Sequence, residues 1–162
     1  DELGAINKRL LASYGNYLTD EDLEILKDNS VSFVYCPRVS DFLHHKKLDF
    51  ETVIKYFPKK FGFGTNSLAF NPDLSLLNEV KYVNNGQLNP IEVIEYLTKY
   101  PAKILRLDNI IGTLEEGKDA DFNVFKLQDN ETYSDVINKE RPDYVYIKGH
   151  KMVSKGELVK KV

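Results

Sequence analysis

The stretch VSFVYC at residues 31–36 decides the fold, because it is rich in β-branched and aromatic side chains and stops at Pro37. Two more short apolar runs lie on either side of it, LLASY at residues 10–14 and FGFG at residues 61–64. Segments with helical signals separate the three runs. An alternation of helices with nearly continuous apolar strands is typical of a parallel sheet covered by helices. We therefore predict an α/β fold.

The first predicted helix follows the run at residues 10–14. Thr19 is a suitable N-cap, and the three acidic residues after it stand where the positive end of the helix dipole favours carboxylates. We expect this helix to end near Asn29. The apolar residues predicted to pack are Leu23, Ile25 and Leu26.

A second, short helix is predicted between the strands at residues 31–36 and 61–64. Asp49 is its expected N-cap and Pro58 ends it. Its apolar residues are Phe50, Val53, Ile54 and Phe57.

Two later helices share a start signal, an asparagine followed by proline at the first helical position. Asn71 opens one of them and Asn89 the other, where Glu92 completes a capping box. The residues predicted to pack are Leu74, Leu77 and Val80 in the first helix and Ile91, Ile94 and Leu97 in the second.

The last third of the chain has a different pattern. Residues 120–125 alternate in polarity, and residues 144–153 read as a hairpin. We therefore predict two domains: residues 1–107 with the alternating strands and helices, and residues 108–162 with β strands and a C-terminal tail. The basic end at Lys160-Lys161 is expected to be a frayed, solvated terminus.

Composition excludes several classes of protein. The 22 basic and 25 acidic residues give a net charge of −3 and form no basic stripe, so nucleic acid is not an expected partner. No apolar run approaches the roughly 20 residues of a membrane span, and Asp1-Glu2 does not open a signal peptide. A cytoplasmic location is expected.

The single cysteine, Cys36, excludes an internal disulfide and any zinc site with several thiolates. We interpret it as a small buried hydrophobic residue and not as a nucleophile, because the sequence shows no histidine that is evidently placed to activate its thiol.

Chemistry-bearing residues are few. The three histidines are His44, His45 and His150, and the first two cannot both face one site from a regular strand. The chain contains no His-x-His, no phosphate-binding glycine loop and no nucleophile elbow. By itself it holds no complete catalytic constellation.

Four motifs nevertheless follow one another along the chain in an order and spacing that can be compared with known families. They are LASYGNYLTDE at residues 11–21, VYCPR at 34–38 continuing to FLHH at 42–45, GFGTNSLAFNPDLSLLNE at 62–79 and IGTLEEGKDADF at 111–122. Together they resemble the last part of an amidohydrolase superfamily protein, in the branch of chlorohydrolases, cytosine deaminases and aminofutalosine deaminases.

The resemblance implies the C-terminal part of a (β/α)8 metal-dependent hydrolase barrel, followed by strands of a small accessory β sandwich. The runs at residues 10–14, 31–36 and 61–64 then correspond to the sixth, seventh and eighth barrel strands, and the first five are not in this chain. The start at Asp1, just before the sixth strand, leads us to expect a truncated chain.

The resemblance also implies a site at the carboxyl ends of the strands, with zinc or iron held by histidines and by an aspartate after the eighth strand. Tyr14 stands where the family has its sixth-strand histidine, and Asn66 where it has that aspartate. An amide oxygen is a neutral, poor ligand, and a tyrosine with a pKa near ~10 is no substitute for imidazole as an acid or base. This chain alone is expected to bind no metal.

Each of these residues has a plainer interpretation. Asn66 is also suited to an ordinary turn, and Tyr14 to core packing with a satisfied hydroxyl. His45 lies in a stretch that closes the substrate pocket in the relatives, or else in a solvated loop. Arg38 pairs with a substrate or with Asp41.

Two functions stay open. In the first, this chain is part of a deaminase that hydrolyses a C–N bond of a purine-like or nucleoside-like aminated heterocycle, and it is not competent alone. In the second, it is a catalytically degenerate homologue that acts as a small-molecule binding or scaffold protein. The expected partners are a small-molecule substrate and the missing N-terminal part of the barrel. Whether the protein is a homo-oligomer is open.

Overall fold

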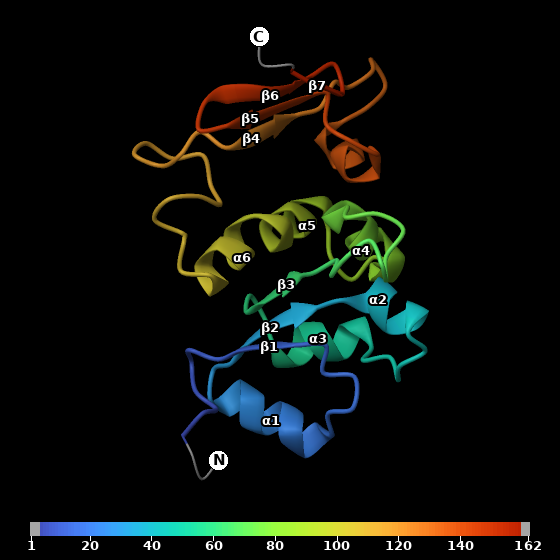
Figure 1. Cartoon of the computed structure of the whole chain (residues 1–162), viewed down its shortest axis with the longest axis vertical. Coiled ribbons are helices and arrows are strands. Elements are labelled where there is room, and N and C mark those ends of the chain that lie inside the picture. The colour runs from blue at the N-terminus through green and yellow to red at the C-terminus, as the bar shows by residue number, and fades with distance from the viewer. Residues whose placement is uncertain (1–3, 160–162) are drawn as a thin grey trace.

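The computed structural model describes residues 4–159, so the predictions on Asp1-Glu2 and Lys160-Lys161 lie outside the described residues. A parallel sheet lies next to helices that separate it from an antiparallel sheet (Figure 1). The predicted α/β fold is confirmed.

The parallel sheet has the order β1-β2-β3. Its strands are β1 (Leu11–Ser13), β2 (Ser32–Tyr35) and β3 (Phe61–Phe63). All three predicted runs therefore form strands, with β2 in the centre. Within the described residues β1 and β3 each pair on one side only, with β2.

The capping signals locate most helix starts correctly. Thr19 and Asp22 form a capping box at α1 (Asp20–Asp28), and Asp49 accepts from the Thr52 amide at α3 (Phe50–Tyr56). Asn89 and Glu92 form a capping box at α5 (Pro90–Leu97), as predicted. The short polar side chains satisfy backbone amides that have no partner inside the helix.

The predicted start of α4 is wrong. This helix runs over Leu76–Val83 with Ser75 as its N-cap, so Asn71 lies five residues before its first residue. Leu74 is outside the helix and exposed. Asn71 forms no cap because its side chain is held away from the helix start: its nitrogen donates to the backbone oxygen of Thr65 and to the Glu79 carboxylate, and its buried oxygen, the atom that a cap would use, accepts no hydrogen bond within the described residues.

The predicted packing face of α5 is partly wrong, although Leu97 packs against the core as predicted. Ile91 and Ile94 are exposed, while Val93 and Tyr96 are buried. The Tyr96 ring stacks on Phe61 of β3 and thereby fixes the rotation of the helix. In α1, likewise, Leu23 and Leu26 are buried but Ile25 is exposed.

Three short helices have no counterpart in the prediction. They are α2 (Pro37–Phe42), α6 (Lys99–Ile104) and the 3₁₀ helix η1 (Tyr133–Asn138). Each has only six residues, too few to show a helical apolar period. No helix within residues 4–159 is long and apolar enough to cross a bilayer.

The core lies around β2 and β3 and is rich in aromatic rings. Phe33 stacks on Phe57 with centroids 4.7 Å apart, and both side chains are fully buried. At the end of β3, a Cβ on Gly64 would lie 2.7 Å from Val34 Cγ1 and 2.8 Å from Cys36 Sγ. Glycine is therefore required for the close approach of β3 to β2 at this end.

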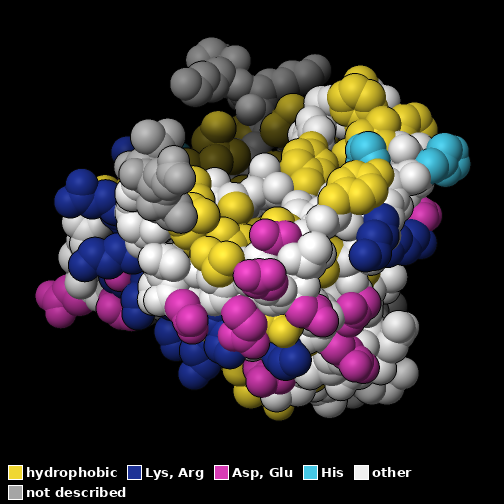
Figure 2. Space-filling model, turned by 90° about the horizontal axis from the view of Figure 1, so that it is seen from below, with side chains coloured by type: hydrophobic (Ala, Val, Ile, Leu, Met, Phe, Trp, Pro, Cys, Tyr) yellow, Lys and Arg dark blue, Asp and Glu magenta, His cyan; other side chains and the backbone are white. Residues whose placement is uncertain are grey.

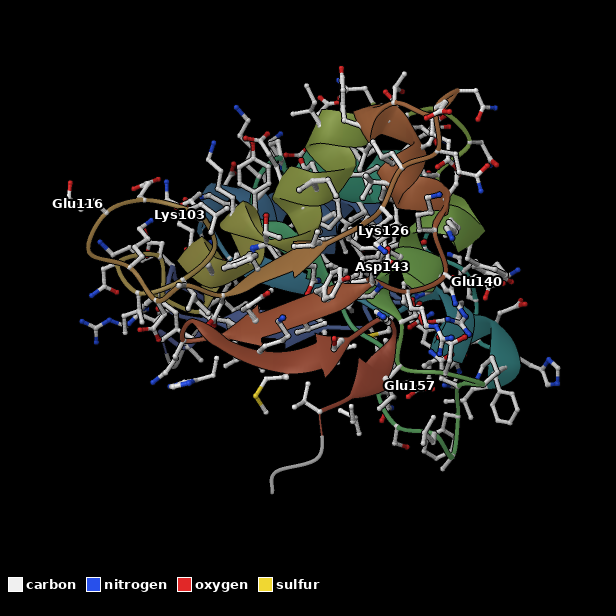
Figure 3. All side chains as sticks on the ribbon, turned by 90° about the horizontal axis from the view of Figure 1, so that it is seen from above. Lys103, Glu116, Lys126, Glu140, Asp143 and Glu157 are labelled. Atoms are coloured by element: carbon white, nitrogen blue, oxygen red, sulfur yellow. The ribbon has the colours of Figure 1, made fainter. Side chains whose placement is uncertain are left out.

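The tail forms an antiparallel sheet in the order β4-β5-β6-β7, and the predicted strand and hairpin are confirmed. Its strands are β4 (Phe122–Val124), β5 (Tyr144–Ile147), β6 (His150–Ser154) and β7 (Glu157–Leu158). Figure 3 looks onto this sheet and labels charged residues of the sheet and of the segments around it. One of them, Asp143, accepts from the Lys126 amide at 2.7 Å and so joins the end of β4 to the start of β5.

Candidate functional site

The carboxyl ends of parallel strands meet at one edge of a sheet, where barrel folds place their sites. Tyr14 directly follows β1, and Asn66 lies in the loop that follows β3. Both residues have left-handed backbone, with φ of 70° at Tyr14 and 56° at Asn66. Asparagine adopts this conformation readily, but a tyrosine there is strained, and such strain is concentrated at functional sites.

The structure brings these two residues together. The Asn66 side-chain nitrogen donates a hydrogen bond to the Tyr14 hydroxyl. The bond joins the ends of the two outer strands across 52 residues of sequence. Tyr14 is half-buried and does not belong to the buried core, whereas Asn66 is exposed.

A pocket of about 450 Å³ opens beside Tyr14. Its lining consists of Tyr14, Gly15, Asn16, Tyr17, Leu18, Leu43 and His45. The Tyr17 hydroxyl lies 3.0 Å from His45 Nδ1, and the two rings meet edge to face. The structure thus places His45 at this pocket, and its role in binding a substrate stays a prediction. Figure 2, seen from the α1 side, shows hydrophobic side chains gathered beside histidine at one edge of the molecule.

Two lining residues next to Tyr14, Gly15 and Asn16, shape the pocket. Gly15 has a φ of +60°, and a Cβ there would lie 2.8 Å from Phe33 Cζ, so only glycine fits. The neighbouring Asn16 is buried, and its amide nitrogen donates to the backbone oxygen of Lys46 at 2.8 Å. That bond holds the loop after β1 against the segment that follows His45.

Arg38 pairs with Asp73 and not with Asp41. Its two terminal nitrogens lie 2.9 and 3.0 Å from the two Asp73 carboxylate oxygens. Asp41 binds Lys47 instead, at 2.6 Å. The guanidinium holds the pKa of Asp73 well below its usual range. A contact between Arg38 and a substrate stays a prediction.

Sequence reasoning missed Glu79, a fully buried carboxylate in the middle of α4. It accepts from Asn71 Nδ2 at 2.6 Å and from the Arg38 backbone amide at 3.2 Å. Burial raises its pKa above the usual value, against the opposing effect of these bonds. No local signal distinguishes it, because a glutamate in a helix is usually solvated.

Cys36 is buried at the end of β2, next to the start of α2. Burial raises the pKa of its thiol to about 11, which leaves little thiolate near neutral pH. The structure agrees with its interpretation as a small buried hydrophobic residue.

The residues present do not fit a metal ion. Within residues 4–159, no three histidine, cysteine, aspartate or glutamate side chains come together. The Asn66 side chain directs its amide nitrogen to Tyr14, and its amide oxygen is uncharged and therefore a poor metal ligand. A divalent cation held at this edge would therefore need ligands from outside the described residues.

The family of the chain follows from a comparison with family models. The model of the amidohydrolase family matches residues 1–152. This chain belongs to the amidohydrolase family. The resemblance inferred from the four motifs is thereby confirmed.

Several of its curated relatives are deaminases of longer sequence. It is 29% identical over 143 residues to a 5-methylthioadenosine/S-adenosylhomocysteine deaminase of Pyrococcus furiosus, a match over 79% of this chain and 32% of the relative. A guanine deaminase of Dictyostelium discoideum is 25% identical over 174 residues, covering 91% of this chain and 38% of the relative. The amidohydrolase chain thus spans about a third of the length of these relatives.

Solved structures share the fold. An adenosine deaminase of Xanthomonas campestris with bound zinc superposes with a TM-score of 0.83 at 23% identity, over 100% of this chain and 41% of that one. Helicobacter pylori aminofutalosine deaminase gives a TM-score of 0.70 at 23% identity, over 90% of this chain and 39% of that one.

Proposed function

We propose that this amidohydrolase chain is the C-terminal part of a (β/α)8 barrel, with residues 1–107 forming its last strands and helices and residues 108–162 belonging to a small β sandwich. The parallel order of β1, β2 and β3 supports the first assignment. The free edges of β1 and β3 within the described residues are the edges that the remaining strands of a closed barrel would pair with.

The complete protein, in this proposal, holds a purine-like or nucleoside-like aminated heterocycle at the carboxyl ends of the strands. The names of the two curated relatives given above, a 5-methylthioadenosine/S-adenosylhomocysteine deaminase and a guanine deaminase, support this class of ligand. The pocket beside Tyr14 supports the place, since it is lined by apolar and aromatic side chains with a few polar groups. Hydrolysis of the C–N bond with release of ammonia is the reaction of that lineage, and the chain is not competent for it alone.

One observation favours a ligand-binding protein in which that hydrolysis is lost. Asn66 and Tyr14 occupy the two site positions of this chain and are hydrogen-bonded to each other. The amide supplies neither the charge of a carboxylate nor an acceptor for a proton, and the phenol does not titrate as an imidazole does. We therefore infer a degenerate amidohydrolase that binds the heterocycle without deaminating it.

The test uses the complete protein. We expect adenosine or guanine to bind in calorimetry, with no ammonia released and without stoichiometric zinc or iron in elemental analysis. Ammonia release with tightly held metal would show an active deaminase instead. Absence of binding for a panel of aminated purines and pyrimidines would refute the ligand class.

Restoring the replaced residues makes the test sharper. Asn66→Asp and Tyr14→His should each raise metal affinity or C–N hydrolysis modestly, and the double variant by more than the sum, because residues of a catalytic unit are not additive. Asn123→Asp and Tyr133→His change the same residue types at exposed positions far along the chain and serve as controls. The plainer interpretations predict unchanged metal binding for Asn66→Asp, and for Tyr14→His only a loss of about 1–3 kcal/mol of stability.

A further inference from the structure

Glu79 is the buried ionisable group that the proposed site does not use. Its side chain has 0% exposure, although it lies on a helix whose other buried residue is Val80. A buried carboxylate loses its hydration, and replacement of such groups by apolar residues of similar size is often neutral or stabilising. Its presence therefore calls for a role other than packing.

The contacts of Glu79 lead to the loop after β3. Its Oε1 accepts from Asn71 Nδ2 at 2.6 Å, and the same nitrogen donates to the backbone oxygen of Thr65 at 3.1 Å. Asn71 is itself buried, with 4% exposure. Thr65 directly precedes Asn66, so the carboxylate is connected to the site residue through one amide group.

The other carboxylate oxygen faces the first turn of α2. Glu79 Oε2 accepts from the Arg38 backbone amide at 3.2 Å, and Arg38 Nη1 lies 3.6 Å from Oε1. The Arg38 guanidinium, 11% exposed, then binds Asp73 with both of its terminal nitrogens. Asp73 in turn accepts from the Ser75 amide at 2.9 Å.

These bonds hold the loop between β3 and α4 at two places, near its start at Thr65 and near its end at Asp73. Asn66 lies between them, and its left-handed backbone and its bond to Tyr14 both need a fixed loop. The backbone oxygen of Thr65 and a carboxylate oxygen of Glu79 both accept from the buried side-chain nitrogen of Asn71. Loss of either bond would leave buried polar atoms without a hydrogen-bond partner.

We propose that Glu79 is a positioning residue for the ligand site: through Asn71 it fixes the turn at Thr65 and Asn66 and thereby the contact between Asn66 and Tyr14. The statement about the ligand rests on the proposed function, whereas the statement about the turn does not. Neither Glu79 nor Asn71 touches the ligand in this proposal.

The experiment compares Glu79→Gln and Asn71→Ser with Glu51→Gln in the complete protein. Glutamine keeps an oxygen for Asn71 but turns an amide group toward the Arg38 backbone donor, and serine is too short for either bond of Asn71. Glu51 is exposed on α3 and provides a matched change of charge. If Glu79→Gln does not fold, Asn71→Ser gives the answer.

Two readouts are taken on folded protein. Hydrogen exchange in a peptide covering residues 64–68 should rise by about tenfold or more in Asn71→Ser, because a released loop opens more often. It should rise by a smaller factor in Glu79→Gln, because glutamine keeps an oxygen for Asn71 and loses only the contact with the Arg38 backbone amide. Exchange in residues 150–158 should not change. Adenosine affinity should fall by about tenfold, and the control Glu51→Gln should leave both quantities as they are.

The outcomes separate the two proposals. Unchanged exchange at residues 64–68, with a lower melting temperature alone, would make Glu79 a structural residue and overturn the inference. If adenosine binds to no form, the proposed function fails, and the exchange data still decide whether Glu79 positions the turn.

Discussion

The two halves of the molecule differ in how they exclude water. Every buried hydrophobic residue of the described chain lies between Leu23 and Ala102. Of the described residues after Ala102, none is buried to that degree, although they include a four-stranded sheet. Regular hydrogen bonding alone therefore does not produce a core.

The reason is the number of layers. The parallel sheet has helices packed on it: Tyr96 of α5 stacks on Phe61 of β3, and Tyr100 of α6 packs edge to face on Tyr96. The antiparallel sheet relies on pairs across its strands, such as the stacked rings of Phe122 and Tyr146 and the Lys151 ammonium over Tyr144. A sheet covered on one side only leaves such side chains half exposed, so the tail depends on what it packs against.

The largest expected effect comes from removing a core ring. Phe57→Ala empties a fully buried position and should cost about 3–5 kcal/mol of unfolding free energy. Phe122→Ala removes the same side chain from the half-exposed sheet of the tail and should cost less than half of that. Urea unfolding of the complete protein measures both. Equal losses would contradict the difference between the halves.

A smaller loss is expected where β3 approaches β2. Gly64→Ala places a methyl group 2.7 Å from Val34 Cγ1, and the branched side chain has little freedom to move, so we expect about 1–3 kcal/mol of destabilisation. Gly62→Ala is the comparison within the same strand, because its nearest neighbour, Pro101 Cγ, is 3.1 Å away. Its loss should be smaller. A larger loss at Gly62 would mean that the carboxyl end of the sheet is not its tightest point.

Buried Glu79 and partly exposed Asp73 should give the stability of the first half a characteristic pH dependence. Burial raises the pKa of Glu79 above its ordinary value of 4.5, so the unfolded state loses this proton first. The stability that protonated Glu79 supplies is therefore present at low pH and declines as the pH rises from 4.5 toward the raised value. Arg38 lowers the pKa of Asp73 below 3.8, so its contribution is present above 3.8 and is lost as the pH falls.

The measurement is urea unfolding at a series of pH values for the wild type, Glu79→Gln and Asp73→Asn. The difference between wild type and Glu79→Gln should shrink with rising pH, and the difference between wild type and Asp73→Asn should grow. The two variants serve as controls for each other. Slopes of the same sign would show that the cluster titrates in another way.

The smallest effect is expected from an ion pair of the tail. Lys139 and Glu131 lie 2.6 Å apart near η1, in a partly exposed position. Glu131→Gln should change stability by less than about 1 kcal/mol and by still less at high salt. A loss as large as that of Gly64→Ala would mean that charge pairing, and not the missing second layer, governs the tail.

The sequence predicted elements wherever the signal is local. The capping residues Thr19, Asp49 and Asn89 mark true helix starts because a cap uses only its own and the next few residues. Asn71 has the same asparagine-proline signal as Asn89, but bonds to Thr65 and Glu79 hold its side chain where its oxygen meets no backbone amide of the described residues. The prediction of which side of α5 packs on the core was partly wrong for a similar reason. The Tyr96 ring stacks on Phe61, a residue far from it in the sequence, and this contact sets the rotation of the helix.

The site was predictable only through the family motifs. Those motifs single out Tyr14 and Asn66, and no composition or periodicity indicates that residues 52 positions apart share a hydrogen bond. Glu79 was missed because its burial is set by the loop that folds over it. The pairing of Arg38 with Asp73, and not with the nearby Asp41, likewise depends on the path of that loop.

The reactivity of Cys36 can report when β2 and β3 separate at their carboxyl ends. This residue is the single thiol of the sequence, it lies under the junction of β2 and β3, and a pKa of about 11 keeps it in the unreactive form. A thiol reagent can therefore modify Cys36 only when this junction separates. The rate of that reaction follows the motion of the strand ends that carry Tyr14 and Asn66, without any added label.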